Sequence, residues 1–297
     1  MSHHHHHDVN GKRLGLTIFL NVIITAGQVV GGFISGSIAL LTDAAHNFSD
    51  VLSLVISYVA NRLARRKPTL KQTFGFRRSE IIAAFVNSVT LVVIALIIVY
   101  EAIGRLFSPE PVSSNWVIWL ALLSIVLNGV SVLLIKADAH SNLNMKSAML
   151  HLFSDMMTSI GVLIGGLLMK FYDWYYADAI FAILIAGYLL YLSWEIFNDS
   201  LRILMQFTPK HIDVREITSG ICGVKGVKNI HHVHCWQLDD HRVIFEGHLD
   251  LVADISISEF EIILQEIKAY LGKHGIHHVN IQPEFHTADS KELINQH

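Results

Sequence analysis

Six long apolar runs constrain the fold of this chain more than any other feature of its sequence. Each run has about the 20 residues that an α-helix needs to cross the hydrocarbon core of a bilayer. The first run is followed after Ser35, Gly36 and Ser37 by a second of equal length, which favours a helical hairpin over a cleavable signal peptide. We therefore expect six membrane-spanning helices, at about Leu14–Ile34, Ile38–Ala60, Ile81–Ile103, Trp116–Ile135, Leu143–Met169 and Ala179–Phe197.

The composition agrees with a protein that lies in a lipid bilayer. Of 297 residues, 52% are hydrophobic and 16% are charged, whereas soluble domains have about 25% charged residues. A net charge of −3 argues against a nucleic-acid partner. The two cysteines, Cys222 and Cys235, form no readable disulfide framework and favour a reducing compartment for the C-terminal part.

The distribution of Lys and Arg between the apolar runs predicts the orientation, because these residues stay on the cytoplasmic side. Eleven lie at the amino end and in the loops after the second and fourth runs, whereas the opposite side has only Arg105 and Lys170. Both termini are therefore expected in the cytoplasm. We predict a His-rich cytosolic N-terminus over residues 1–13, a six-helix membrane domain over 14–200, a cytosolic domain over 201–290 and a tail over 291–297.

The cytosolic domain is predicted to be a small α+β unit in the order αββαβ. Its expected elements are a helix at Asp213–Ile221, strands at Val227–Leu238 and Arg242–Val252, a helix at Ser256–Leu271 and a strand at His277–Phe285. In the second strand, Val243, Phe245, Leu249 and Leu251 alternate with Ile244, Glu246, His248 and Asp250, so one face is apolar and the other offers ligands. Residues Asp239-Asp240-His241 predict the turn between these two strands, and the tail from Thr287 is expected to be frayed.

Two identical patterns of ionisable residues lie inside the predicted spans. The second span contains His46 and Asp50, and the fifth contains His151 and Asp155. Residues i and i+4 share one face of a helix, so each span presents an imidazole and a carboxylate in the same direction. At 1.5 Å per residue, Asp50 and Asp155 lie about 15 Å and 18 Å from the cytoplasmic ends of their spans, near mid-membrane. Two such spans facing each other would form a tetrahedral site suited to Zn²⁺.

A hydrogen bond between packed helices is the alternative interpretation of each His-Asp pair. Two copies at matched depth favour a metal site, because two carboxylates and two neutral imidazoles neutralise one divalent cation. Asp43 lies three residues before His46 on the same face. Asp43 and Asn47 are candidates either for orienting His46 or for lining the path of the ion, and the sequence leaves both roles open.

Together these residues resemble the cation diffusion facilitator family, and its bacterial zinc-exporting members in particular. The resemblance rests on Leu41-Thr42-Asp43-Ala44-Ala45-His46 with Asp50, on His151 with Asp155, on the segment Phe74 to Glu80 that opens the third span, and on the αββαβ domain. It implies a homodimeric Zn²⁺/H⁺ antiporter that exports zinc across a bacterial inner membrane by alternating access. It also implies a ferredoxin-like, metallochaperone-like cytosolic domain.

The resemblance extends to metal ligands in the cytosolic domain. Family ligands fall near His231 and His248, and those of the third strand correspond to Gln282 and Glu284. Strand alternation places Cys235 on the side of His231, so His231, His248, Glu284 and Cys235 are the candidate cytosolic ligands. Some members bind a further ion in the loop after the second span, but this chain has Gln72 and Phe76 there, so we do not expect that site.

Acid-base chemistry suggests how transport would be coupled to protons. A neutral imidazole holds either a metal or a proton, and its unperturbed pKa of about 6.5 is close to cytosolic pH. An intramembrane metallohydrolase is disfavoured, because the chain has no His-Glu-x-x-His pattern and four ligands leave no position for water. A membrane zinc sensor, or a non-transporting subunit of a heterodimer, stays open as the alternative. The sequence also leaves open the physiological metal (Zn, Cd, Fe, Co or Ni) and whether His3 to His7 is a tag.

Overall fold

The computed structural model of the protein describes residues 6–64, 66–139, 143–239 and 242–294. Two compact units make up the chain. The first unit comprises Met1–Tyr58 and Val86–Phe197, and the second comprises Val59–Phe85 and Asn198–His297. Two sequence features discussed above lie outside the described residues, namely His3–His5 and the turn residues Asp240-His241.

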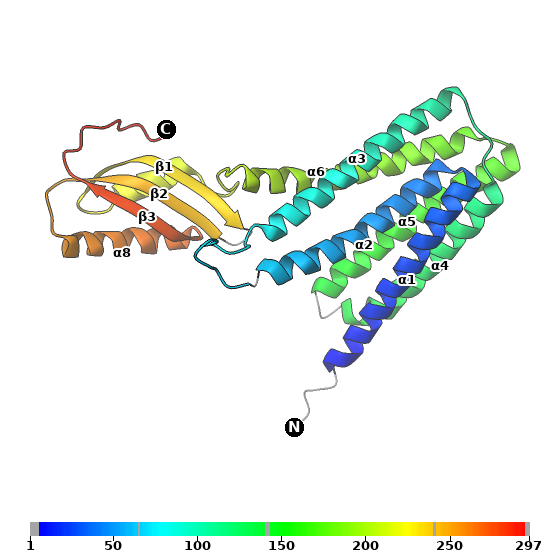
Figure 1. Ribbon diagram of the computed structural model, residues 1–297, viewed down its shortest axis with the longest axis horizontal. Coiled ribbons are helices and arrows are strands. Elements are labelled where there is room, and N and C mark those ends of the chain that lie inside the picture. Colours follow the sequence, from blue (N-terminus) through cyan, green and yellow to red (C-terminus); the bar gives the residue numbers. More distant parts are fainter. Residues whose placement is uncertain (1–5, 65, 140–142, 240–241, 295–297) are drawn as a thin grey trace. The chain divides into compact units, whose positions relative to one another are not determined.

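Long helices account for most of the first two hundred residues (Figure 1). Those among the described residues are α1 (His6–Ser35), α2 (Ile38–Ala64), α3 (Ser79–Phe107), α4 (Ser114–Ala139), α5 (Leu143–Tyr172) and α6 (Tyr176–Leu204). Among the described residues, four helical segments are long and apolar enough to cross a membrane, at Ser79–Phe107, Ser114–Leu134, Met149–Tyr172 and Tyr176–Leu204. Among the described residues, α1 contributes the apolar segment Phe19–Ser35, and α2 carries the polar series from Thr42 to Asp50.

Small side chains in the first unit let its helices approach closely. Helix α4 packs against α1 and α5, and six alanines from α3, α4 and α6 are almost completely buried, namely Ala95, Ala102, Ala121, Ala177, Ala182 and Ala186. Small residues have this role in helix pairs that pack within lipid. Large apolar side chains such as Phe107, Trp119 and Tyr191 are instead exposed, which is the pattern of a helical unit surrounded by lipid.

Helix α2 begins at a turn that is anchored by a carboxylate of α6. Gly36, just before the helix, has a φ of 71°, a backbone conformation that glycine adopts more easily than other residues. Asp178, in the first turn of α6 and 1% exposed, accepts hydrogen bonds from the backbone N–H groups of Ile38 (2.7 Å) and Ala39 (3.3 Å) and from the Ser37 hydroxyl. A carboxylate satisfies unpaired backbone donors at a helix N-terminus and complements the helix dipole. The helix that carries His46 and Asp50 is therefore tied at its start to α6.

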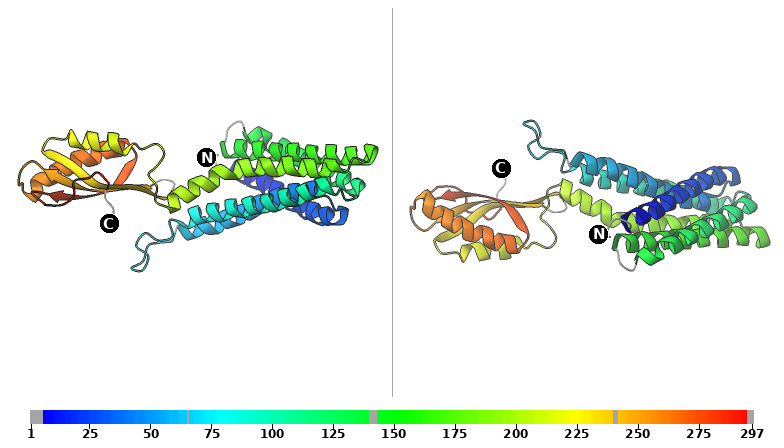
Figure 2. Two further views of the ribbon diagram at one scale, coloured as in Figure 1. Left: turned by 90° about the horizontal axis from the view of Figure 1, so that it is seen from above. Right: turned by 90° about the horizontal axis from the view of Figure 1, so that it is seen from below.

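The second unit contains a three-stranded mixed sheet in the predicted order αββαβ. Its elements are α7 (Val214–Cys222), β1 (Val227–Asp239), β2 (Arg242–Leu251), α8 (Ile257–Lys273) and β3 (Ile276–Glu284). The strand order is β1-β2-β3, and β2 runs antiparallel to β1 and parallel to β3. Helices α7 and α8 cover one face of the sheet (Figure 2). On that face the predicted apolar residues of β2 meet Ile221 and Ile267 in the core.

Strand β1 departs from regular alternation at His232. A φ of 52° at this residue and a register shift between His231 and His234 mark a β-bulge. Beyond the bulge, Cys235 lies in the apolar core, whereas His231 lies beside His248, with ring centroids 5.5 Å apart. The prediction that His231 and Cys235 share one side of the strand is therefore wrong, because an inserted residue reverses the side that follows it.

The C-terminal tail is not frayed, as had been predicted. As far as Ile294 it lies along β1. The backbone N–H groups of His232 and Val233 donate to the carbonyl oxygens of Glu292 (3.1 Å) and Leu293 (2.8 Å), and Leu293 packs against the core. The bulge thus gives the tail two backbone partners. The polar composition from Thr287 onward had indicated fraying, but these bonds and the apolar anchor hold the segment beside His231.

Candidate metal sites

Helices α2 and α5 bring the two His-Asp pairs of the first unit together. His46 Nε2 lies 3.3 Å from Asp155 Oδ1, and His151 Nε2 lies 3.3 Å from Asp50 Oδ2. Within the helices, His46 Nδ1 is 3.5 Å from Asp50 Oδ2, and His151 Nε2 is 3.8 Å from Asp155 Oδ2. The two imidazoles lie edge to face, with centroids 6.0 Å apart. Each histidine therefore faces a carboxylate of its own helix and one of the other helix.

The polar atoms of this cluster are buried and lack hydrogen-bond partners. Among the described residues, no hydrogen bond reaches either ring nitrogen of His46, either carboxylate oxygen of Asp155, or Oδ2 of Asp50. The side chains of Asp155 and His46 are 0% and 6% exposed, while that of His151 is 43% exposed. Burying imidazole and carboxylate atoms without hydrogen bonds is costly, even where, as here, they face one another. Since ligand atoms of His46, Asp50 and Asp155 lie within 4.8 Å of one another, one cation between them would satisfy the group.

Asp43 is fully buried and, unlike Asp155, fully hydrogen-bonded. Its Oδ2 accepts from Gln28 Nε2 (2.6 Å) and Ser159 Oγ (2.8 Å), and its Oδ1 accepts from Thr158 Oγ1 (2.8 Å). Gln28 in turn accepts a hydrogen bond from Asn47 Nδ2 (2.7 Å) through its Oε1. The network joins α1, α2 and α5 directly beside the His-Asp cluster. Three donors occupy the carboxylate of Asp43, so its lone pairs serve helix packing here.

A second cluster of ligand-type residues lies in the second unit, on β1, β2, β3 and the tail. Ligand atoms of His231, His248, Glu284 and Asp289 lie within 4.8 Å of one another. His248 Nδ1 is 2.7 Å from Glu284 Oε1, and His231 Nε2 is 3.3 Å from Glu284 Oε2 and 3.1 Å from Asp289 Oδ2. His231 and Glu284 are buried. Three of the four residues predicted for the cytosolic site are thus brought together.

Cys235 is the predicted cytosolic ligand that does not join this cluster. It lies in the apolar core, where burial raises the pKa of its thiol to about 11. Its place is taken by Asp289 from the tail. Gln282 contributes from β3 by donating a hydrogen bond from Nε2 to Glu284 Oε1 (3.2 Å), so it holds a ligand carboxylate through its amide.

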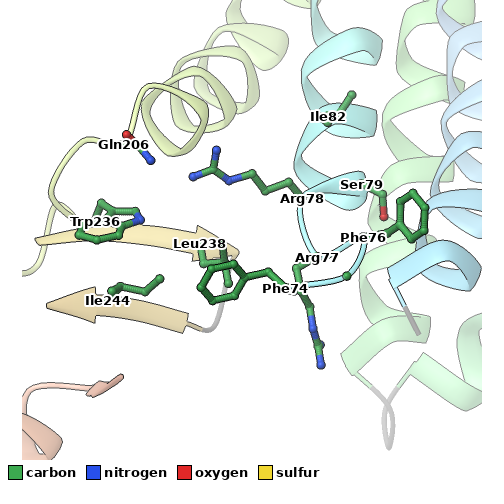
Figure 3. Close-up of a pocket in the computed structure, with 11 residues that line it drawn as sticks. Phe74, Phe76, Arg77, Arg78, Ser79, Ile82, Gln206, Trp236, Leu238 and Ile244 are labelled. Atoms are coloured by element: carbon green, nitrogen blue, oxygen red, sulfur yellow. The ribbon is translucent and has the colours of Figure 1, made fainter. Parts of the chain in front are cut away.

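The segment that opens the third predicted span lines a pocket in the second unit. The pocket has a volume of about 510 Å³ and lies between Phe74, Arg78 and the strand residues Trp236, Leu238 and Ile244 (Figure 3). Its described lining includes no His, Cys, Asp or Glu. This hollow therefore offers apolar surface and guanidinium groups but no metal ligand.

Gln28 and Asp289 lie beside these clusters, and the sequence does not mark either as a site residue. Gln28 is an intramembrane amide, which is a signal of helix packing, but its partner Asp43 could not be identified without the fold. Asp289 lies in a polar tail with no periodic pattern, and its approach to His231 depends on the bulge at His232. No local signal marks a residue whose position is set by such an irregularity.

Comparison with known proteins follows the same division of the chain. Residues 14–205 match the family model of the cation efflux transmembrane domain, and residues 209–286 match that of the cation efflux protein cytoplasmic domain, a dimerisation domain. The chain is 35% identical to the cadmium, cobalt and zinc/H(+)-K(+) antiporter of Bacillus subtilis, over 96% of this chain and 92% of that protein. It is 34% identical to zinc transporter ZitB of Escherichia coli, over 96% of this chain and 93% of that protein. It is also 34% identical to the metal cation efflux system protein CzcD of Cupriavidus metallidurans, over 98% of this chain and 93% of that protein.

Proposed function

Because this chain belongs to the cation efflux family and is a multi-pass membrane transporter of divalent metal cations, we propose that it exports Zn²⁺ from the cytoplasm in exchange for protons. The observation that carries the proposal is the meeting of His46, Asp50 and Asp155 in one buried group of ligand atoms, with His151 Nε2 3.3 Å from Asp50 at its edge. His46, Asp50, His151 and Asp155 are the proposed transport site.

The donor set of this site selects the cargo. Two nitrogens and two oxygens suit the four-coordinate preference of Zn²⁺ and accommodate the softer Cd²⁺. Mg²⁺ and Ca²⁺ are rejected because they require six or more oxygen ligands. The names of the relatives from B. subtilis and E. coli include zinc, which agrees with this choice.

The same donors support exchange for protons. A neutral imidazole that releases a metal ion can take up a proton in its place, so protons and Zn²⁺ compete for His46 and His151. Higher cytosolic pH favours loading, and a more acidic exterior favours release. Alternating access then returns the protonated site to the cytoplasm. The four groups titrate as a coupled set, so the exchange belongs to the cluster rather than to one residue.

Asp43 and Asn47 are proposed to position the transport site rather than to bind the ion. The hydrogen bonds of Asp43 to Gln28, Thr158 and Ser159 support this role, because they fix how α2 lies against α1 and α5. Partners that orient metal ligands in this way typically change metal affinity by about 10- to 100-fold when they are removed.

In the second unit, His231, His248 and Glu284 are proposed to form a cytosolic Zn²⁺ site, with Asp289 in place of Cys235. The cluster of ligand atoms within 4.8 Å supports it. Zinc bound there would stabilise the ferredoxin-like unit through which two copies of the chain form a homodimer, in agreement with the match to a dimerisation domain.

The proposed topology places all six long helices across a bacterial inner membrane, with both termini in the cytoplasm. Eleven Lys and Arg residues on the side of the termini, against two on the other side, support this orientation. Helix α2, with the polar series from Thr42 to Asp50, carries the proposed ligands His46 and Asp50.

The test is Zn²⁺ uptake into proteoliposomes with an acidic lumen, comparing the wild type with Asp155→Asn. Asparagine keeps the size of the side chain but removes its charge, so we expect uptake to fall to the level of empty vesicles. The matched control is Glu195→Gln, which removes an exposed carboxylate from α6 and should leave uptake unchanged.

Two further arms separate transport from its coupling. Collapsing the pH gradient should abolish concentrative uptake by the wild type while leaving slow equilibration. If the folded wild type moves no Zn²⁺ under either condition, export of zinc is refuted. If Asp155→Asn transports normally, the assignment of the site is refuted while the activity stands.

A further inference from the structure

A lysine from the C-terminal tail places its ammonium group inside the cytosolic ligand cluster. Lys291 Nζ lies 3.0 Å from Asp250 Oδ1, 3.1 Å from Glu284 Oε2 and 3.3 Å from His231 Nε2, and it also donates to Asp289. These partners include three of the four residues grouped as ligands. The ammonium therefore lies where a bound cation would share the same atoms.

The tail holds this lysine close without fixing its side chain. The two residues that follow Lys291 are anchored to β1. The backbone N–H groups of His232 and Val233 donate hydrogen bonds to the carbonyl oxygens of Glu292 and Leu293. The side chain of Lys291 is 35% exposed and ends on a flexible four-carbon stem. It can swing out into solvent while the tail backbone stays in place.

Resting on the proposed cytosolic site but not on transport, we propose that Lys291 is a tethered competitor that occupies this site until a divalent cation displaces it. The charge of the cluster supports the exchange. Asp250, Glu284 and Asp289 carry three negative charges around His231, and the ammonium balances only one of them. A divalent ion balances two and accepts the electron pairs of oxygen and nitrogen ligands.

Zn²⁺ and the ammonium cannot share the site. An ammonium offers three donors and no acceptor, so the carboxylate oxygens that it contacts, Asp250 Oδ1 and Glu284 Oε2, direct lone pairs at it. His231 Nε2 and Glu284 Oε2 would have to turn their lone pairs to the metal, and the two cations would repel each other at the distance of a hydrogen bond. Binding through these atoms therefore requires the ammonium to leave. The site then fills only when free Zn²⁺ is high enough to compete with a permanently present cation.

The direct test follows the reactivity of the lysine amine in the full-length wild type in detergent. Acetylation by an amine-reactive ester is quantified by mass spectrometry with and without Zn²⁺, and exposed Lys268 on α8 serves as the internal reference. We expect Zn²⁺ to increase the acetylation rate of Lys291 several-fold and to leave that of Lys268 unchanged. The experiment is repeated in Asp155→Asn, so that the result does not depend on the transport site.

Affinity supplies the second readout. Titration calorimetry with Zn²⁺ is done on full-length protein carrying Asp155→Asn, with and without Lys291→Gln. We expect the added Lys291→Gln to raise the apparent Zn²⁺ affinity about tenfold, because the metal no longer has to displace the charge-assisted contacts of the ammonium. Lys268→Gln makes the same change of charge on α8 and should have no effect.

Each outcome decides the proposal. Acetylation of Lys291 that stays constant at saturating Zn²⁺ would overturn it, as would equal or weaker Zn²⁺ binding by folded Lys291→Gln, since a purely structural ion pair gives those results. If Lys291→Gln does not fold, the acetylation rates of the wild type still decide. Failure of zinc export in proteoliposomes would leave both readouts intact.

Discussion

The proposed transport site and the proposed cytosolic site contain the same types of ligand residue but differ in the positive charge beside them. Both combine histidine and carboxylate groups at separations near 3.3 Å. The contacts described for His46, Asp50, His151 and Asp155 include no lysine or arginine, whereas Lys291 lies inside the cytosolic cluster. Under the proposed roles, the site that hands its ion on would be balanced by the ion alone, and the site that responds to concentration would contain its own competing cation.

The sharpest test of this comparison is a pair of histidine substitutions. His151→Ala removes a proposed transport ligand and should lower the rate of Zn²⁺ uptake by about 100-fold or more, since even residues that only orient ligands cost about 10- to 100-fold. His248→Ala removes a proposed cytosolic ligand and should retain more than about a tenth of the wild-type rate. Proteoliposome flux at matched protein incorporation measures both. Equal loss in the two variants would mean that the sites do not have separate roles.

A smaller effect on transport is expected when Asp43, which is proposed to position the transport site, is changed in place of a proposed ligand. Asp43→Asn replaces one acceptor oxygen with an N–H₂ group, which then faces a hydroxyl or amide donor. We expect a destabilisation of about 1–3 kcal/mol and weaker Zn²⁺ binding, measured by thermal unfolding in detergent and by calorimetry.

Asp173→Asn is the matched control, because Asp173 is exposed and its φ of 51° suits asparagine. It should leave both quantities unchanged. Normal stability with a complete loss of transport in Asp43→Asn would instead assign Asp43 to the path of the ion.

A last prediction, with no expected effect on transport, concerns the thiol of Cys235, which the bulge places in the apolar core. Burial raises the pKa of Cys235 to about 11, so at pH 8 only about one thousandth of it is the reactive thiolate. Exposed Cys222 should be alkylated by iodoacetamide at least about 100-fold faster, as read by mass spectrometry. Because thiolate increases with pH, alkylation of Cys235 should accelerate about tenfold per pH unit up to the pKa. Protection of Cys235 by Zn²⁺ would return it to the ligand set.

The spacing of residues predicts which side chains meet more reliably in the helices of the first unit than in the strands of the second, for a physical reason. A helix repeats without interruption, so His46 with Asp50 and His151 with Asp155 share faces whatever the rest of the fold does. A strand changes sides with each inserted residue, and the bulge at His232 moved Cys235 into the core.

Other features depend on tertiary contacts that no local pattern encodes. The carboxylate of Asp178 that caps α2 comes from more than a hundred residues away along the chain. Lys291 and Asp289 reach their partners because the tail pairs with backbone groups that the bulge exposes. The order of helices and strands, by contrast, follows from apolar periodicity and agrees with the structure.

The cap at the start of α2 fixes one end of the helix and leaves the part that carries Asp50 further along its axis. Because its first turn is held by Asp178, any movement of the helix relative to α6 that keeps these bonds would be a tilt about that end rather than a slide. Asp50 is 12 residues beyond Ile38, about 18 Å along the axis at 1.5 Å per residue, so a tilt of about 10° displaces Asp50 by about 3 Å. That distance is about the separation between Asp50 and His151. A small rotation about a fixed pivot is therefore enough to open the ligand set, without unwinding any turn of the helix.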